Sequence, residues 1–244
     1  MVVLVSAVYL ATTIGSLKIN WTRLWEGLPR GGEFLLAFFS PDFQTRWFDI
    51  SLGILESLTM TSISTVLGIL ISIPIAIGAS KNMAPLPIYL VCRGIIALSR
   101  AFQEVIVAIF CVALFGFGPF AGVITLSFAT IGFLAKLLAE DIEDINKDQL
   151  EAVRATGASW LQSLNYGVLP QVFPRLVGLS VYRLDINFRE SAVIGIVGAG
   201  GIGATLNTSF DRYDFDSAAA ILMIIIGIVL VAEYTSGYIR KGLV

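Results

Sequence analysis

Three glycines and one acid in the C-terminal part of the chain have the spacing of a dinucleotide-binding turn. Gly198, Gly200 and Gly203 spell G-x-G-x-x-G after a run of small and branched residues, and Asp216 follows where a ribose-binding carboxylate would lie. That turn needs a soluble strand–turn–helix unit, whereas the apolar run here covers about 26 residues, too long for a strand. The glycines, with Gly201, therefore indicate a break in a membrane-spanning helix, and we expect them to form an outer gate.

Charged and polar side chains occupy the middle of the same apolar run. They are Arg183, Asp185, Asn187, Arg189 and Glu190. Charges at that depth in a membrane cost several kcal/mol unless they are paired or hydrated. At about 100° per residue, Arg183, Asn187 and Glu190 share one helix face, while Asp185 and Arg189 share the opposite face and can form an ion pair.

Two interpretations of these charges stay open. The first is an internal salt-bridge network that holds a helix bundle together. The second is a polar path for an anion, for which the candidate residues are Arg183, Asn187, Arg189 and Glu190. Arg183 or Arg189 would then lower the barrier that a charged solute meets in a medium of low dielectric constant.

The composition indicates a polytopic membrane protein. Of the 244 residues, 56% are hydrophobic and 14% are charged, whereas soluble domains carry about 25% charged residues. The chain has no histidine, which excludes histidine-based catalysis and histidine metal ligands. Cys92 and Cys111 lie apart in apolar surroundings, so we expect no metal site and no catalytic group. The net charge of −2 predicts no nucleic-acid partner.

Six stretches are long and apolar enough to cross a bilayer as helices, which predicts an all-α fold. They cover residues 2–17, 51–78, 87–116, 119–139, 172–197 and 217–238. The first is expected to be a span and not a cleaved signal, because it lacks a basic flank and no A-x-A site follows. No repeat or long linker divides residues 1–244, so one domain is predicted, in which residues 51–244 form the core.

The distribution of Lys and Arg predicts that both termini lie in the cytoplasm. This orientation places inside Lys81, Arg93, Arg100, Lys136, Lys147, Arg154, Arg175, Arg240 and Lys241, and outside Lys18, Arg23, Arg30, Arg46 and Arg212. Trp21, Trp25 and Trp47 fall in the first outer segment, up to residue 50, around an apolar stretch at 33–39. Amphipathic rings of this kind anchor helices at a membrane surface, so we expect an outer interfacial helix here.

The longest polar stretch between spans, residues 140–170, carries a known motif on the expected cytoplasmic side. Two short helical runs are predicted, one over 149–156 that stops at Gly157 and one over 158–166 that ends at Leu169 and Pro170. Glu151-Ala152-Val153, Gly157, Gly167 and Leu169-Pro170 resemble the EAA loop of ABC importer permeases in spacing. Val153 and Gly167 replace the alanine and the isoleucine of that pattern.

The resemblance implies the partners as well as the fold, that of a type I ABC importer permease. In the family this loop forms coupling helices that dock on a cytoplasmic ATPase, which gives Glu151, Ala152, Gly157, Leu169 and Pro170 a coupling role. It also implies a homodimer in a bacterial inner membrane, two ATP-binding subunits and a periplasmic substrate-binding protein. The chain has no G-x-x-x-x-G-K-[ST] motif, so ATP and Mg²⁺ are expected on the partner, with no cofactor and no enzymatic activity in this chain.

Two further stretches resemble the permeases of phosphonate importers, whose close relatives import phosphite or hypophosphite. They are YRLDINFRESAVIGIVGAGGIG, from residue 182, and GFGPFAGVITLSFATIGFLAKLLAEDIE, residues 116–143. The resemblance covers roughly residues 85–244 and implies transport of a phosphonate or of a related reduced-phosphorus oxyanion. Two alternatives are kept at this stage: an ABC permease for another small solute such as an amino acid, and a secondary transporter that does not use ATP.

Overall fold

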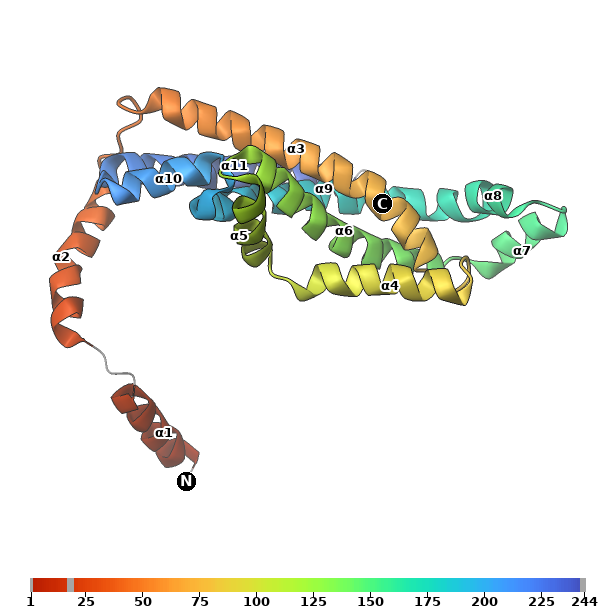
Figure 1. The fold of residues 1–244 in the computed structure, drawn as a ribbon, viewed down its shortest axis with the longest axis horizontal. Helices are drawn as coiled ribbons and strands as arrows, with labels where there is room; N and C mark the ends of the chain where they lie inside the picture. The colour runs from red at the N-terminus through yellow and green to blue at the C-terminus, as the bar shows by residue number, and fades with distance from the viewer. Residues whose placement is uncertain (1, 17–19, 242–244) are drawn as a thin grey trace.

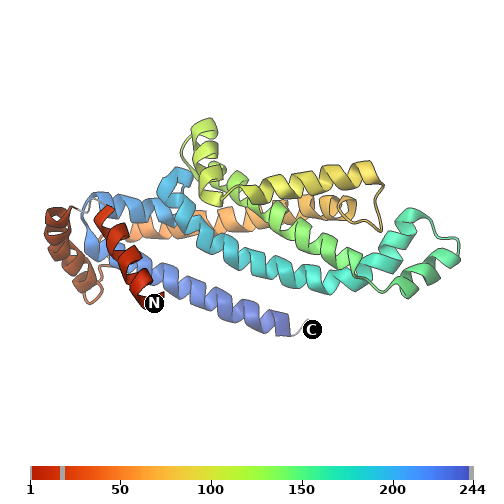
Figure 2. The ribbon, with the colours of Figure 1, turned by 90° about the horizontal axis from the view of Figure 1, so that it is seen from below.

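The computed structural model describes residues 2–16 and 20–241, and in these ranges the regular structure is helical throughout. Four long helices form the body of the molecule: α3 (Trp47–Gly78), α6 (Pro119–Glu143), α9 (Leu169–Ile194) and α11 (Phe215–Lys241). Figures 1 and 2 show them lying along one axis. Leu17 and Lys18, from the first predicted span and the outer charge set, lie outside the described residues, as do the side chains of Arg240 and Lys241.

Helices α3 and α6 pack closely because the buried side of α3 carries small and hydroxyl-bearing residues. A Cβ atom at Gly68 would overlap the Thr130 side chain, and one at Gly122 would overlap Met60. Small residues at such positions let helix backbones approach each other where lipid supplies no hydrophobic driving force. The hydroxyl groups of Ser64, Thr65 and Ser72 donate to carbonyl oxygens of the same helix, as Thr65 Oγ1 does to Thr61 at 2.7 Å.

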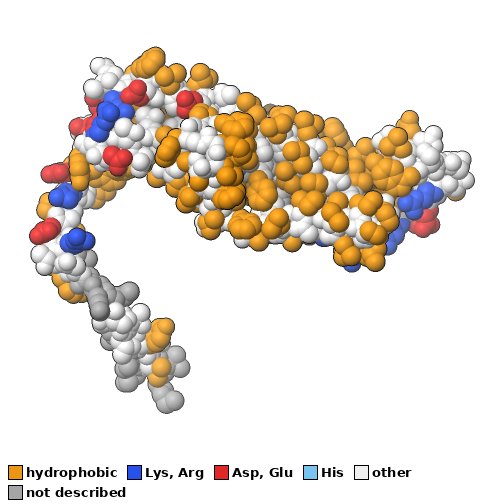
Figure 3. All heavy atoms as spheres, in the orientation of Figure 1, with side chains coloured by type: hydrophobic (Ala, Val, Ile, Leu, Met, Phe, Trp, Pro, Cys, Tyr) orange, Lys and Arg blue, Asp and Glu red, His pale blue; other side chains and the backbone are white. Residues whose placement is uncertain are grey.

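Apolar side chains cover the middle of the bundle, and charged side chains gather toward its two ends (Figure 3). Three described helices are long and apolar enough to cross a membrane, namely α3, α6 and residues 215–238 of α11, and two bent helix pairs raise the total to five. Helix α1 (Val2–Ser16) has 15 residues, fewer than the roughly 20 that a span needs. The first of the six predicted spans, residues 2–17, therefore stays a prediction.

The third predicted span is not one continuous helix. It consists of α4 (Leu86–Ala101) and α5 (Glu104–Phe115), which meet at 92°. Phe102 and Gln103 between them are extended, with ψ values of 134° and 142°. The helical hydrogen-bond ladder stops at this elbow although no glycine or proline lies in it, so the sequence pattern did not indicate the division.

The fifth predicted span begins earlier and continues further than expected. After α7 (Lys147–Ala155), α8 (Trp160–Ser163) runs through a π-helical turn at Leu164–Val168 directly into α9, so the predicted end of the second loop helix at Leu169 and Pro170 is wrong. The wider turn accommodates proline, which has no N–H to donate. A second π-helical turn, Gly195–Ala199, precedes α10 (Ile202–Asp211), which is bent by 55° from α9.

The N-terminal helices lie toward the end of the bundle that is opposite α7 and α8 (Figure 1). Helix α2 (Trp21–Ala37) confirms that a helix forms in the aromatic outer segment, and the Asn20 side chain caps it by accepting from the Arg23 N–H at 3.1 Å. Phe34 attaches α2 to the bundle through ring contacts with Phe210 and Phe215 at 5.5 and 5.9 Å between centroids. The interfacial location of this helix stays a prediction.

Candidate functional site

Arg183 lies in the interior of the bundle, where α9 meets α6 and α5. Its side chain is 4% exposed. Its Nε donates to Thr130 Oγ1 at 3.1 Å, and its guanidinium carbon lies 5.4 Å from the centre of the Phe133 ring. The nearest acidic atom is Glu104 Oε1, 3.9 Å from Nη2, which is an ion pair without a hydrogen bond. Nη2 has no hydrogen-bond partner within the described residues.

Asn187, one turn further along α9, joins three helices. It is fully buried, and its Nδ2 donates to Thr65 Oγ1 at 2.8 Å and to Thr130 Oγ1 at 3.0 Å. Thr130 in turn donates to the Leu126 carbonyl oxygen at 2.6 Å, so its hydroxyl oxygen is free to accept from both α9 side chains. The polar residues of this face of α9 are thus held by hydroxyl groups of α3 and α6.

The opposite face of α9 carries the other two charges. Asp185 is buried and forms an ion pair with Arg189, which is exposed, as the four-residue spacing predicted. Asp185 also lines a cavity of about 240 Å³ between α3, α9 and α11. Glu190 lies half-buried on the Arg183 side of the helix. The two faces predicted from the sequence are therefore present, and their roles in transport stay predictions.

Two acidic residues on other helices contact Arg183 and the glycine cluster, and the sequence analysis did not identify either of them. Glu104 is the acid closest to Arg183. Glu56 Oε2 accepts the backbone N–H of Gly201 at 3.0 Å, and next to it Ser57 Oγ accepts the N–H of Ile202 at 2.9 Å. The available signal was the same as in the fifth span: an acid in an otherwise apolar stretch requires a partner inside the bundle.

The glycine cluster forms the predicted break between α9 and α10. Gly198, Gly200 and Gly201 have φ values of 100°, 79° and 74°, which residues other than glycine rarely adopt. Gly203 is inside α10, and a Cβ atom there would overlap the carbonyl oxygen of Ala192. The break itself is confirmed, and the Glu56 and Ser57 contacts tie it to α3. A gating role for these residues stays a prediction.

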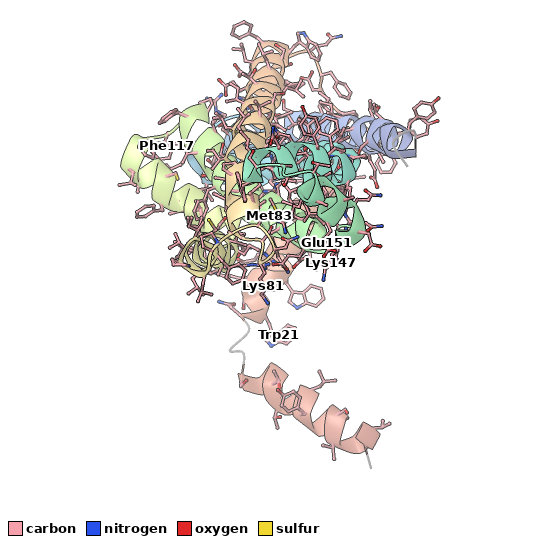
Figure 4. The ribbon with its side chains drawn as sticks, turned by 90° about the vertical axis from the view of Figure 1, so that its right-hand side faces the viewer. Trp21, Lys81, Met83, Phe117, Lys147 and Glu151 are labelled. Carbon is pink, nitrogen blue, oxygen red and sulfur yellow. The ribbon has the colours of Figure 1, made fainter. Side chains whose placement is uncertain are left out.

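At the other end of the bundle, the predicted coupling loop forms a protrusion of α7 and α8 that Figure 1 shows projecting beyond the long helices. Leu150 and Leu164 anchor it in a buried apolar cluster shared with α3, α4, α6 and α9. The Trp160 indole N–H donates to the Met83 carbonyl oxygen at 3.1 Å. Figure 4 views the molecule from this end and labels Glu151 and Lys147 of α7 and Met83 of the α3–α4 turn.

Gly167 explains one departure from the EAA pattern. It is buried in the π-helical turn, where a Cβ atom would lie 3.0 Å from Leu150 Cδ1. Contacts of 3.0–3.4 Å are tighter than nine in ten real Cβ contacts, so a side chain at this position would require the Leu150 side chain of α7 to shift. The glycine therefore permits the close packing of the two loop helices.

The other coupling candidates lie on or near the surface. Glu151, Ala152, Gly157 and Pro170 are exposed and Leu169 is partly buried. Ala152 and Gly157 line a hollow of about 630 Å³ between α7 and α8, together with Val153, Thr156, Ala158, Gln162 and Tyr166. Gly157 has φ of +82°, and a Cβ atom there would meet nothing within 4 Å. The hollow is thus accessible to another protein.

Comparison with known proteins gives a family and a fold. Residues 66–243 match the model of the family described as "Binding-protein-dependent transport system inner membrane component". The chain is 40% identical over 229 residues to the "Phosphate-import permease protein PhnE" of Mycolicibacterium smegmatis, covering 93% of this chain and 43% of that protein. It is 36% identical over 225 residues to the "Putative phosphite transport system permease protein HtxC" of Stutzerimonas stutzeri, covering 91% and 79%.

The chain thus spans less than half the length of the first of these relatives and about four fifths of the second. Among solved structures, the MetNI methionine ABC transporter in an inward-facing conformation resembles it with a TM-score of 0.73. That likeness covers 82% of this chain and 99% of the transporter chain at 21% identity, so it concerns the fold.

Proposed function

The chain belongs to the family of binding-protein-dependent transport system inner membrane components, and from this membership we propose that it is the transmembrane permease subunit of an ATP-driven importer. Its proposed substrate is a phosphonate or a related phosphorus oxyanion such as phosphite or hypophosphite. The named relatives support this substrate class, since they are called phosphate and phosphite permeases. The membrane-spanning helices agree with a transport subunit that is not itself an enzyme.

The protrusion of α7 and α8 is the observation that carries the proposal. It is fixed to the bundle by Leu150 and Leu164, and it exposes the hollow around Ala152 and Gly157. A partner that binds in this hollow can move the bundle, because the protrusion is packed on four of its helices. We assign this position to the ATP-binding subunit, with Glu151, Ala152, Gly157, Leu169 and Pro170 forming the coupling surface.

The proposed assembly contains two copies of this chain, two ATP-binding subunits in the cytoplasm and a substrate-binding protein on the outer side. ATP and Mg²⁺ are bound by the partner subunits. Both termini lie in the cytoplasm in this arrangement, and the membrane is a bacterial inner membrane. Alternation between outward-open and inward-open states moves the solute.

Within the membrane, the proposed path follows the face of α9 that carries Arg183, Asn187 and Glu190. A charged solute needs such a polar face to cross a medium of low dielectric constant. Arg189, the fourth path candidate, lies on the opposite face of α9 in its ion pair with Asp185. The glycines of the α9–α10 break, Gly198, Gly200, Gly201 and Gly203, form the outer gate. The hydrogen bonds from Gly201 and Ile202 to α3 favour this role, because they connect the break to a second spanning helix.

A co-purification tests the assembly. The chain is tagged, native membranes are solubilised in mild detergent, and the proteins that accompany it are identified. We expect a soluble ATPase with a Walker motif in an amount equal to the tagged chain. A chain that runs alone as a stable oligomer would contradict the importer class.

A growth assay then tests the substrate class. Cells that depend on this chain are grown on methylphosphonate, phosphite, hypophosphite or phosphate as the phosphorus source, and methionine uptake serves as the comparison. Growth on one or more phosphorus compounds without methionine uptake is the expected result. Methionine uptake alone would contradict the proposed substrate.

A further inference from the structure

The elbow between α4 and α5 places the N-terminus of α5, which is partly exposed, on the wall of a cavity that Arg183 also lines. The two helices meet at 92°, and Gln103, the N-cap residue of α5, makes no side-chain capping bond. The first N–H groups of any helix lack partners within it, and they carry partial positive charge. In broken membrane helices such ends face anionic groups of bound substrates.

A buried cation with an unused donor lies beside this helix end. Arg183 is 4% exposed, and its Nη2 makes no hydrogen bond within the described residues. A buried guanidinium ordinarily has its N–H groups hydrogen-bonded, because an unpaired buried charge is costly. The 3.9 Å separation from Glu104 Oε1 does not provide such a bond. The open donor therefore indicates a missing acceptor.

A cavity of about 350 Å³ joins the two features. Its polar lining residues are Ser99, Arg100, Gln103, Glu104 and Arg183, with Phe133 among the apolar ones. The two guanidinium groups outnumber the single carboxylate, so the lining carries a net positive charge. The volume is roughly ten times the ~30 Å³ that one water molecule occupies in the liquid, which is room for a small hydrated anion.

We propose that this cavity is an oxyanion-binding site inside the membrane domain and that a phosphorus oxyanion occupies it during transport. The inference rests on the proposed function for the identity of the anion. Arg183 Nη2 and the first N–H groups of α5 donate to the anion oxygens, and Arg100 adds a second positive charge. Charge-assisted bonds of this kind suit the oxygens of phosphite and phosphonate.

The two nearby acids make occupancy weak. Glu104 lies next to Arg183, and Glu190 is within electrostatic range of both. When the anion arrives, it replaces Glu104 as the counter-ion of Arg183, and Glu104 returns when the anion leaves. A translocation site has to bind well enough to admit a solute and weakly enough to release it, and an internal competitor provides the release.

The first experiment measures phosphite uptake and ATP hydrolysis together in proteoliposomes that contain the complete importer and its binding protein. The variant Gln103→Glu adds a carboxylate at an exposed position on the cavity wall. Because like charges repel strongly at short range, we expect at least about a tenfold fall in phosphite moved per ATP hydrolysed. Arg183→Lys keeps the positive charge but loses the planar set of guanidinium N–H donors. We expect it also to lower the amount of phosphite moved per ATP hydrolysed.

Arg175→Lys is the matched control. It makes the same replacement on the same helix, in an exposed residue that pairs with Asp141 at 2.7 Å and does not line the cavity. We expect it to keep the wild-type ratio of phosphite to ATP. A ratio within about twofold of wild type for both cavity variants would overturn the site while leaving the importer function intact.

The second experiment measures occupancy without transport. In a background with Cys92→Ser and Cys111→Ala, Ala129→Cys introduces a thiol on the cavity wall. Inorganic phosphite is expected to slow its labelling by an anionic methanethiosulfonate, and Gln103→Glu should remove the protection. Labelling that phosphite does not slow would overturn the site. Protection of this thiol by phosphite, together with a wild-type importer that moves no phosphorus oxyanion, would instead contradict the proposed function.

Discussion

The two ends of the bundle both depend on glycine, but for different physical reasons. At the α9–α10 break, glycines are required by the chain itself, because backbones and side chains of neighbouring helices fill the space around Gly198 and Gly203. At the α7–α8 protrusion, Gly157 is exposed and a Cβ atom there would meet nothing within 4 Å. Packing inside the molecule therefore constrains the glycines of the break, whereas at Gly157 only the positive φ does so within this chain, and the proposed partner would add a second constraint.

The largest effect that tests this contrast is expected at Gly157. Gly157→Asp and Gly157→Asn both place a residue that tolerates positive φ in the hollow. We expect either variant to insert and fold like wild type, with a loss of stability of about 1 kcal/mol or less. Transport should be abolished while the ATPase subunit still hydrolyses ATP, because the side chain occupies the proposed docking surface.

Uptake and ATP hydrolysis in membranes measure this prediction, with detergent thermal unfolding as the control for folding. Transport at the wild-type rate in both variants would show that the hollow is not a docking surface. Loss of transport in Gly157→Asp but not in Gly157→Asn would identify the added charge, and not the added volume, as the cause.

The next largest effect is expected at Gly203 in the outer break. Gly203→Ala places a methyl group against the carbonyl oxygen of Ala192, and overpacking of this kind costs about 1–3 kcal/mol or more. Gly227→Ala is the matched control, because nothing lies within 4 Å of its Cβ position in α11. Thermal unfolding in detergent should show a clear destabilisation for the first variant and none for the second. Equal melting temperatures would remove the distinction between the two ends.

A smaller effect is expected from Ser57→Ala on α3. The Ser57 hydroxyl accepts the N–H of Ile202, which is fully buried. Removing it leaves that N–H without its partner, at a cost of about 1–3 kcal/mol. Ser62→Ala serves as the comparison, because that hydroxyl only donates to the Leu58 carbonyl oxygen of its own helix. If both variants unfold at the same temperature, the contact between α3 and the break contributes little to stability.

The smallest effect is expected at Asp42, in the outer loop between α2 and α3. The hydroxyl of Thr45, and then the N–H groups of Thr45 and Gln44, hold the pKa of this carboxyl below its ordinary value by hydrogen bonding. A lowered pKa in the folded state stabilises the protein above the unfolded value, about 3.9, and the benefit disappears as the pH falls through the folded value. Asp42→Ala should therefore lower the melting temperature slightly at pH 7 and not at all in strong acid. A difference that grows on acidification would contradict this sign.

The length of the apolar runs in the sequence predicted α3, α6 and α11, because each of these helices is one unbroken apolar run. The cluster of glycines at 198–203 predicted the break before α10. The four-residue spacing of Asp185 and Arg189 predicted their ion pair. The coupling loop was predicted from its residue spacing and its place between two spans, and its coupling role stays a prediction. These features depend on local residue chemistry, which a sequence displays directly.

The elbow and the partners of Arg183 could not be predicted in the same way. Phe102 and Gln103 are ordinary helix residues, and nothing in their types indicates that the chain is extended there. Thr65 and Thr130 are common residues in apolar helices, and only the packing of α3, α6 and α9 brings them to Asn187. The unbroken passage from α8 into α9 was hidden by Pro170, since proline ordinarily stops a helix and here a π-helical turn absorbs it.

That unbroken passage has a mechanical consequence. From Trp160 the chain stays helical up to the kink at Gly198, through the π-helical turn at Leu164–Val168 and past Pro174. At 1.5 Å per residue this helical segment is a rod about 60 Å long. In the proposed importer, a displacement of the α7–α8 protrusion by the ATP-binding subunit would move this helix as a whole. The displacement would then reach the positive-φ glycines at the other end of the helix without a chain of smaller rearrangements between them.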